Sequence, residues 1–233
     1  MQQELTNSNV YSISWWGFVF SLLFATFGVG IIAGLFTFIP SNIYTEFILM
    51  QEPTSLHVSF EDVAFNFAQC TILLLFIYTC EPIKKLIVPS LNFKVLKQIN
   101  VYVYVLLFFA LDWIICSYVL APLFPHAGEE QYIALDFEIL EKHPILLFLG
   151  TAIFVPIHEE LIFRGMILRF LQERFPFWLA AVGSSFIFGI AHIYSVGVMI
   201  SAFISGMFMA ILCKKTNSII PAILLHILIN TFA

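Results

Sequence analysis

Three pairs of residues in the second half of the chain share a spacing of four positions: Glu160 with Arg164, Phe188 with His192, and His226 with Asn230. Residues four apart lie one turn apart on the same face of a helix. Each pair lies in an apolar stretch, where a charge, an imidazole or an amide is costly unless it faces the interior and has a partner. We therefore expect three membrane helices to build one polar site together.

The neighbouring carboxylates Glu159 and Glu160 point about 100° apart on a helix. Glu160 and Arg164 form an acid-to-base pair in the favourable order, which neutralises two charges that are otherwise hard to bury. We therefore assign Glu160 and Arg164 a structural role and leave Glu159 free for chemistry. Pro156, one turn earlier, is expected to kink the helix.

The turn at Phe175-Pro176 should join this helix to the next one. Glu159 lies 15 residues before Arg174, and His192 lies 15 residues after Phe177. At about 1.5 Å per residue, an antiparallel hairpin would bring Glu159 and His192 to the same depth. His226 and Asn230 are expected to lie shallower, unless their helix is tilted or begins deeper in the membrane.

The composition decides the class of protein. The 233 residues are 61% hydrophobic and 11% charged, and the mean hydropathy is +0.96. A soluble domain is about half apolar and a quarter charged. We therefore expect an all-α polytopic bundle in a bilayer. The net charge is −5 and no basic run occurs, so we expect no nucleic-acid partner. The four scattered cysteines do not indicate a disulfide framework.

Seven apolar runs qualify as spans, of which the fifth and the last are short. Lysines and arginines gather in alternate loops, which the positive-inside rule places in the cytoplasm. This asymmetry predicts a protein of the cell membrane with its N-terminus inside and its C-terminus outside. The segment 1–14 lacks the features of a signal peptide, so the first run should remain as a span. The runs are 13–39, 63–80, 100–120, 144–165, 177–193, 196–213 and 218–233.

We divide the chain into N-terminal spans (1–143) and a catalytic core of about four spans (144–233). The acidic segment 128–143 between them is read as a solvated loop in preference to a short surface helix. Small residues spaced four apart on the fifth and sixth spans predict close contact between these helices. They are Ala181, Ser185 and Gly189 on one span, and Ala202, Gly206 and Ala210 on the other.

Each group taken alone also has a purely structural interpretation. A buried Glu–Arg pair can be a bridge, a single histidine can be a hydrogen-bonded core residue, and Phe188 is a packing residue on almost any interpretation. Asp112, in the third span, fits a structural and a site-lining role equally. His158 precedes the two carboxylates, but the second histidine of a zinc-protease helix is absent. The coincidence of all three pairs favours a functional site.

These motifs resemble those of the CAAX-processing and bacteriocin-processing (CPBP, or Abi) family of intramembrane proteases. That family has Glu-Glu-x-x-x-Arg, Phe-x-x-x-His and His-x-x-x-Asn on successive membrane helices, and all three occur here within about residues 145–233. The resemblance implies an endopeptidase in which Glu159 and His192 activate a water molecule. His226 and Asn230 would then stabilise the oxyanion, with Glu160, Arg164 and Phe188 supporting the site.

A metal remains an alternative to this water-only mechanism. Glu159, His192 and His226 would form a set of two histidines and one carboxylate, the ligand count of a catalytic zinc site. Asn230 favours the metal-free version, because an amide is a poor zinc ligand but a good oxyanion donor. We therefore expect no metal and keep zinc as the alternative.

The resemblance implies a substrate that is a peptide or a lipid-modified protein at the bilayer; the oligomeric state is not predicted.

Two other functions compete with proteolysis. A non-catalytic scaffold or bacteriocin-immunity protein of the same fold would have no reason to keep Glu159, His192, His226 and Asn230 together. A transporter or proton relay should show broken helices or repeated halves, and the sequence shows neither.

Overall fold

The computed structural model describes residues 12–232, and these residues are helical with no β-strand. The all-α prediction is confirmed. The segment examined for a signal peptide lies largely outside the described residues. The elements are α1 (Trp15–Leu23), η1 (Phe24–Gly28), α2 (Val29–Asn42), η2 (Ile43–Leu49), α3 (Ser55–Thr79), α4 (Glu81–Ile87), η3 (Val88–Ser90), η4 (Phe93–Lys97), α5 (Ile99–Ile115), η5 (Cys116–Leu120), α6 (Ala121–Leu123), α7 (Ala127–Ala134), α8 (Phe137–Leu140), α9 (Pro144–Leu147), η6 (Phe148–Phe154), α10 (Val155–Glu160), η7 (Leu161–Leu168), α11 (Arg169–Gln172), α12 (Phe177–Ala191), α13 (Val196–Thr216) and α14 (Ile220–Phe232).

Several of these elements join end to end into long helices. Within the described residues, five helices are long and apolar enough to cross a membrane, and two shorter apolar helices, α12 and α14, accompany them. All seven predicted runs are therefore helical, and the fifth and last are the short ones. The long helices are Trp15–Ile48, Ser55–Thr79, Ile99–Leu123, Pro144–Gln172 and Val196–Thr216. Several extend beyond the predicted limits because hydropathy marks only the apolar part of a helix.

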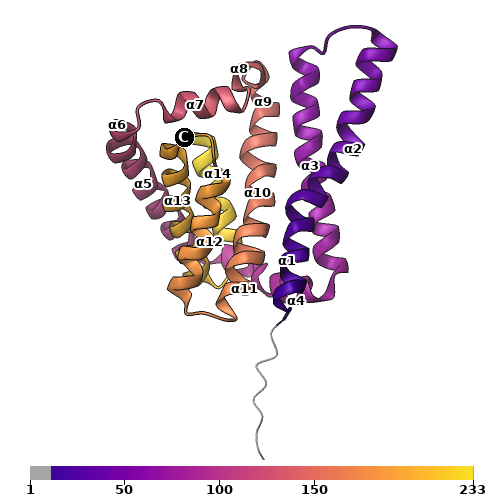
Figure 1. Cartoon of the computed structure of the whole chain (residues 1–233). Helices are drawn as coiled ribbons and strands as arrows, with labels where there is room; N and C mark the ends of the chain where they lie inside the picture. Colours follow the sequence, from indigo (N-terminus) through magenta and orange to yellow (C-terminus); the bar gives the residue numbers. More distant parts are fainter. Residues whose placement is uncertain (1–11, 233) are drawn as a thin grey trace, which may run out of the picture.

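The helix Pro144–Gln172, made of α9, η6, α10, η7 and α11, lies between two groups of helices (Figure 1). On one side are α1, α2 and α3, and α3 packs against η6 and α10. On the other side are α5, α12, α13 and α14, and α14 packs against η6, α10, α5 and α13. The central helix therefore meets both α12 and α14, which carry the other two motifs.

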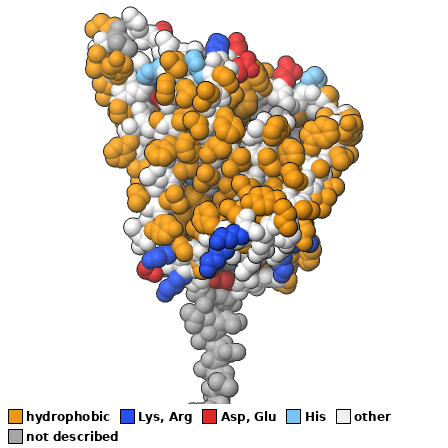
Figure 2. Space-filling model, turned by 180° about the vertical axis from the view of Figure 1, so that it is seen from behind, with side chains coloured by type: hydrophobic (Ala, Val, Ile, Leu, Met, Phe, Trp, Pro, Cys, Tyr) orange, Lys and Arg blue, Asp and Glu red, His pale blue; other side chains and the backbone are white. Residues whose placement is uncertain are grey.

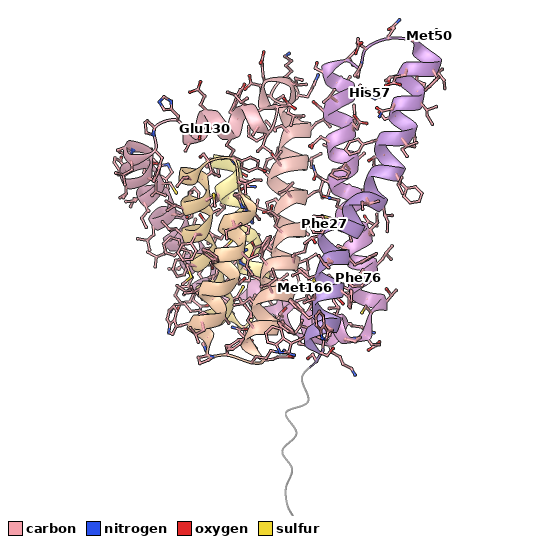
Figure 3. The ribbon with its side chains drawn as sticks, in the orientation of Figure 1. Phe27, Met50, His57, Phe76, Glu130 and Met166 are labelled. Atoms are coloured by element: carbon pink, nitrogen blue, oxygen red, sulfur yellow. The ribbon has the colours of Figure 1, made fainter. Side chains whose placement is uncertain are left out.

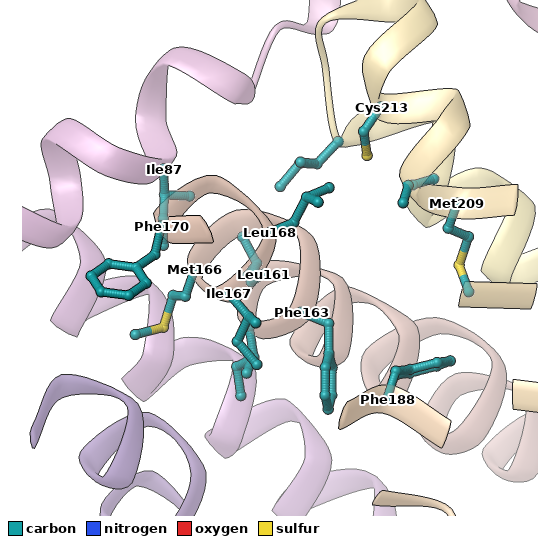
Figure 4. Packing of buried hydrophobic residues seen from close by; sticks show 14 of the residues in the cluster. Ile87, Leu161, Phe163, Met166, Ile167, Leu168, Phe170, Phe188, Met209 and Cys213 are labelled. Atoms are coloured by element: carbon teal, nitrogen blue, oxygen red, sulfur yellow. The ribbon is translucent and has the colours of Figure 1, made fainter. Parts of the chain in front are cut away.

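The hydrophobic core surrounds the C-terminal half of this central helix. Every side chain of η7, from Leu161 to Leu168, is buried. Met166 and Leu168 are completely buried, and Ile87 packs against this segment (Figure 4). Met166 lies toward the end opposite Met50 and Glu130 (Figure 3).

The acidic segment before the central helix differs from the expectation. It was expected to be mainly a solvated loop, but it forms two short helices, α7 and α8. Helix α7 lies across one end of the bundle (Figure 1). Its start is held close to α13, because a Cβ atom on Gly197 would lie 2.6 Å from the Cβ of Phe124 and 2.7 Å from that of Ala127. Contact with α13 therefore orders a segment whose sequence alone favours a loop.

The outer surface fits a bilayer. Hydrophobic side chains cover the middle of the molecule, and charged side chains gather at its two ends (Figure 2). Large apolar residues such as Trp16, Phe36 and Ile99 are more than 70% exposed on this surface. Exposing such side chains to water is costly in free energy, whereas exposing them to lipid is not. The chain is therefore an integral membrane protein of the polytopic helical type.

The contact between α12 and α13 depends on small residues, as the spacing predicted. A Cβ atom placed on Gly189 would lie 2.7 Å from the backbone oxygen of Met199 and 3.1 Å from the Cβ of Phe203. Glycine therefore allows the two backbones to touch near the end of α12. This contact fixes the position of His192, three residues further along the chain.

Candidate active site

The central helix presents its two glutamates to different surroundings. The side chain of Glu160 is 0% exposed, whereas that of Glu159 is 24% exposed. Part of the Glu159 side chain is therefore accessible from outside the protein, whereas Glu160 is enclosed. The two residues stand between the π-helical segments η6 and η7. Such segments interrupt the regular hydrogen-bond ladder and are frequent at functional sites.

Glu160 and Arg164 form the buried ion pair that the spacing predicted. Arg164 Nη1 donates to Glu160 Oε1 at 2.9 Å, and both side chains are 0% exposed. The guanidinium carbon lies 4.4 Å from the centre of the Phe188 ring, a cation–π distance. A Cβ atom on Gly206 would lie 3.1 Å from Arg164 Nη2. Arg164 therefore occupies a slot bounded by α12 and α13 and holds Glu160 in place.

His226 reaches this pair because α14 begins inside the protein. Ser218 and Ile219, just before the helix, are 0% exposed. Ser218 Oγ donates to the carbonyl of Asn92, and the Ile219 amide donates to the carbonyl of Ser90. The short loop around η3 and η4 thus carries the start of α14 into the bundle. The start of α14 is therefore anchored inside the protein by two hydrogen bonds to this loop.

His226 lies between the two glutamates. Its Nδ1 is 3.1 Å from Glu160 Oε1, and its Nε2 is 3.7 Å from Glu159 Oε2. An ionised carboxylate can only accept, so Nδ1 carries a proton when it faces an ionised Glu160. The second distance is too long for a direct hydrogen bond. It is shorter than two hydrogen bonds end to end, so an oxygen atom can bond to both groups only from the side.

The four charged groups form a balanced set. If His226 is an imidazolium and Glu159 is ionised, their charges cancel, as those of Glu160 and Arg164 do. If His226 loses a proton, the balance is kept when Glu159 gains one. A carboxylate and an imidazole placed this close are groups between which one proton can pass. A site that takes and returns one proton can perform general acid–base chemistry.

The structure brings His192 to the same site through Phe188. His192 Nδ1 donates to the Phe188 carbonyl at 2.8 Å, which leaves Nε2 as the nitrogen available for chemistry. The Phe188 ring contacts the rings of both His192 and His226, at centroid distances of 4.6 and 5.6 Å. Within the described residues, no hydrogen bond or ion pair joins His192 to Glu159. The nearer partner of Glu159 is therefore His226.

Phe188 itself packs in the core. It is 2% exposed and meets Phe163 of the central helix edge to face, at a centroid distance of 4.9 Å (Figure 4). One aromatic ring therefore contacts Arg164, His192 and His226, and it sets the spacing between the helices that carry them. This is a supporting position, as the sequence analysis expected.

Asn230 lies at the edge of the cluster. Its Nδ2 donates to the backbone carbonyl of Thr151 at 3.0 Å, and its side chain is exposed. In the described chain, no hydrogen bond links Asn230 to Glu159, His192 or His226. An amide nitrogen carries two protons, so one N–H remains available for a ligand. Thr151 was not predicted, because its backbone oxygen leaves no signal in the sequence.

The alternative zinc set does not converge in this arrangement. Among residues 12–232, no group of three His, Cys, Asp or Glu side chains is placed to hold a metal ion. Glu159 and His226 are close, but the side chain of His192 does not complete the set. We therefore derive no chemical step through a metal.

Asp112 lies on the other side of α14 from the glutamates, beside a cavity of about 440 Å³. Its carboxylate is 4% exposed and accepts from Ser205 Oγ at 2.6 Å. The rest of the lining is mainly apolar and includes Ile229 and Phe232 of α14. Asp112 therefore has a structural bond to α13, and the cavity that it lines includes none of Glu159, His192, His226 and Asn230.

The chain was compared with known proteins. Residues 141–232 match the family described as type II CAAX prenyl endopeptidase Rce1-like. A relative from Bacillus subtilis (strain 168), named "Putative membrane peptidase YdiL", is 32% identical over 95 residues, which cover 41% of this chain and 38% of the relative. The chain thus spans well under two thirds of that relative. No solved structure matches.

Both comparisons agree with the motifs. The matched family segment includes every residue from Glu159 to Asn230 and thus the whole candidate site. The spans before it, in residues 1–140, lie outside the match. The resemblance to CPBP-type membrane proteases that the three motifs predicted is therefore confirmed over residues 141–232.

Proposed function

We propose that the protein is an intramembrane endopeptidase that hydrolyses a peptide bond in a membrane-associated peptide or protein. The observation that carries the proposal is the pair Glu159 Oε2 and His226 Nε2, 3.7 Å apart and supported by the buried Glu160–Arg164 bridge. Glu159 Oε2 is buried and has no hydrogen-bond partner in the described chain. A water molecule bound beside these two atoms, within hydrogen-bond reach of both, would give each of them a partner.

In this mechanism Glu159 removes a proton from the water as the water oxygen attacks the carbonyl carbon of the substrate. As the water leaves His226 to form the new C–O bond, the Nε2–H of His226 and the free N–H of Asn230 donate hydrogen bonds to the carbonyl oxygen, which becomes negative. The proton then passes to the leaving amine, the C–N bond breaks, and a carboxylate and an amine are released. His192 Nε2 is available to relay that proton.

The apolar cavity beside α14 supports a substrate that has an apolar part. The cavity lined by Ile229 and Phe232 adjoins the helix that carries His226 and Asn230. The Rce1-like family description names a prenyl endopeptidase, and a lipid-modified C-terminal peptide combines a scissile bond with an apolar chain. We propose substrates of this CAAX type or apolar peptides processed at the membrane, with the N-terminus of the enzyme in the cytoplasm and its C-terminus outside.

The test uses the purified protein in detergent and a panel of quenched fluorescent peptides, some prenylated at a C-terminal Cys-a-a-X sequence and some unmodified. We expect wild-type protein to cleave at least one member, and Glu159→Ala and His192→Ala to lose that cleavage while keeping their melting temperatures. The matched control is Glu129→Ala on α7, which should cleave normally. Equal biological activity of wild type and both site variants, without cleavage, would instead indicate a scaffold.

A further inference from the structure

Tyr194 lies beside the site, in the turn 192–195 that joins α12 to α13 outside both helices. Its ring meets that of His192 at a centroid distance of 6.2 Å and an angle of 82°. The residue is partly buried. An edge-to-face contact of this kind fixes the direction of the tyrosine ring relative to the imidazole.

The hydroxyl of Tyr194 is an available donor. Within the described chain no hydrogen bond engages it, so its O–H is available to a ligand. Burial first, and the charge of the Glu159 carboxylate second, raise the pKa of this hydroxyl above its ordinary value. The hydroxyl therefore stays protonated, and Tyr194 lies close enough to Glu159 to be affected by its charge.

The donors already assigned to the oxyanion are partly engaged. His226 Nδ1 is committed to Glu160, and one N–H of Asn230 is committed to the Thr151 carbonyl. Sites for acyl transfer commonly present two or more preorganised donors to the developing negative charge. The turn after α12 supplies a further O–H, on the residue whose ring contacts His192.

We propose that the Tyr194 hydroxyl is a catalytic donor to the carbonyl oxygen of the scissile peptide. Its hydrogen bond to this oxygen becomes stronger as the oxygen becomes negative in the transition state. The inference rests on the proposed endopeptidase function. Tyr194 exchanges no proton in this step. The water oxygen bonds to the carbonyl carbon, the π pair moves to the oxygen, and Glu159 takes the water proton.

The competing interpretation is that Tyr194 only anchors the turn at the membrane surface, as tyrosines often do. The two interpretations differ in which part of the side chain matters. An anchor or a packing role uses the ring, whereas an oxyanion donor requires the hydroxyl. Two substitutions separate them: Tyr194→Phe removes only the hydroxyl, and Tyr194→Leu removes both hydroxyl and ring.

The experiment measures kcat and KM for a peptide that the wild-type protein cleaves, with melting temperatures recorded for every variant. Losing one oxyanion donor typically lowers kcat by about 10²–10³, so we expect Tyr194→Phe to lose about that much, with little change in KM or melting temperature. Tyr194→Leu should lose at least as much. Tyr118→Phe, at an exposed position on η5 away from the site, is the matched control and should keep the wild-type rate.

The outcomes separate the two proposals. If wild type cleaves and Tyr194→Phe has a kcat within about threefold of it, the inference about Tyr194 is wrong while the endopeptidase remains. A loss only in Tyr194→Leu would assign the residue to packing and would also overturn the inference. If neither wild type nor any control cleaves a peptide, the endopeptidase proposal and the inference fall together.

Discussion

The buried pair Glu160–Arg164 makes a quantitative prediction about stability. Both side chains are 0% exposed and are joined by a 2.9 Å hydrogen bond. Breaking a buried pair by removing one partner typically costs about 3–5 kcal/mol, because the remaining charge is buried without compensation. Replacing both partners by apolar side chains of similar size is often neutral. We therefore expect Glu160→Met and Arg164→Met each to lose about 3–5 kcal/mol.

The structure refines this expectation for each variant. Without Arg164, the Glu160 carboxylate keeps a partner in His226 at 3.1 Å. Without Glu160, Arg164 keeps the rings of Phe188 and Phe163, at 4.4 and 6.0 Å, but no anion, and its Nε and Nη2 have no hydrogen-bond partner in the described chain. Glu160→Met should therefore be the more damaging single substitution. The double variant should be no less stable than either single variant.

The assay is a double-mutant cycle on the free energy of unfolding, measured by titrating the protein in mixed micelles with a denaturing detergent. The control cycle uses Glu81 and Lys84, an ion pair 3.0 Å long whose side chains are 63% and 41% exposed. Exposed pairs are worth about 0–1 kcal/mol. If the losses of Glu160→Met and Arg164→Met simply add in the double variant, as at the control pair, the buried bridge does not hold the site together.

Three further predictions concern packing, the metal and Asn230. Gly189→Ala should destabilise the protein by about 1–3 kcal/mol, because the new Cβ would lie 2.7 Å from the Met199 oxygen, whereas Gly128→Ala meets no atom within 4 Å and should be neutral in the same thermal melt. Chelators should leave the cleavage rate unchanged, and a loss restored by zinc would show that a metal takes part. Asn230→Ala should lower kcat by about 10²–10³ with little change in melting temperature; an unchanged kcat would remove Asn230 from the mechanism.

Sequence patterns predicted much of this fold because membrane helices are strongly constrained. Backbone groups in lipid must bond within their own helix, so apolar runs of sufficient length become helices. The four-residue spacing then predicted the ion pair between Glu160 and Arg164. It also predicted which faces of α12 and α13 touch. Hydropathy could not predict where the helices end outside the apolar layer, and it could not foresee that Gly197 would hold α7 against α13.

The pairing within the site was harder to predict. Counting residues from the hairpin placed Glu159 at the depth of His192, but the close partner in the structure is His226. Helix α14, which carries His226, starts on a buried loop, where Ser218 bonds to Asn92. That contact joins residues 126 positions apart in the chain, so no local pattern records it. Tyr194, two residues after His192, could have been noticed as an aromatic neighbour of a motif histidine.

The central claim is that the Glu159 carboxylate takes a proton from the attacking water beside His226. Its most direct test is the cleavage rate of Glu159→Gln, which keeps the size and polarity of the side chain but removes the base. General-base catalysis contributes about 10²–10⁴, so we expect a loss of this size in kcat, with an unchanged melting temperature and substrate binding. A Glu159→Gln protein that cleaves at the wild-type rate would contradict the claim.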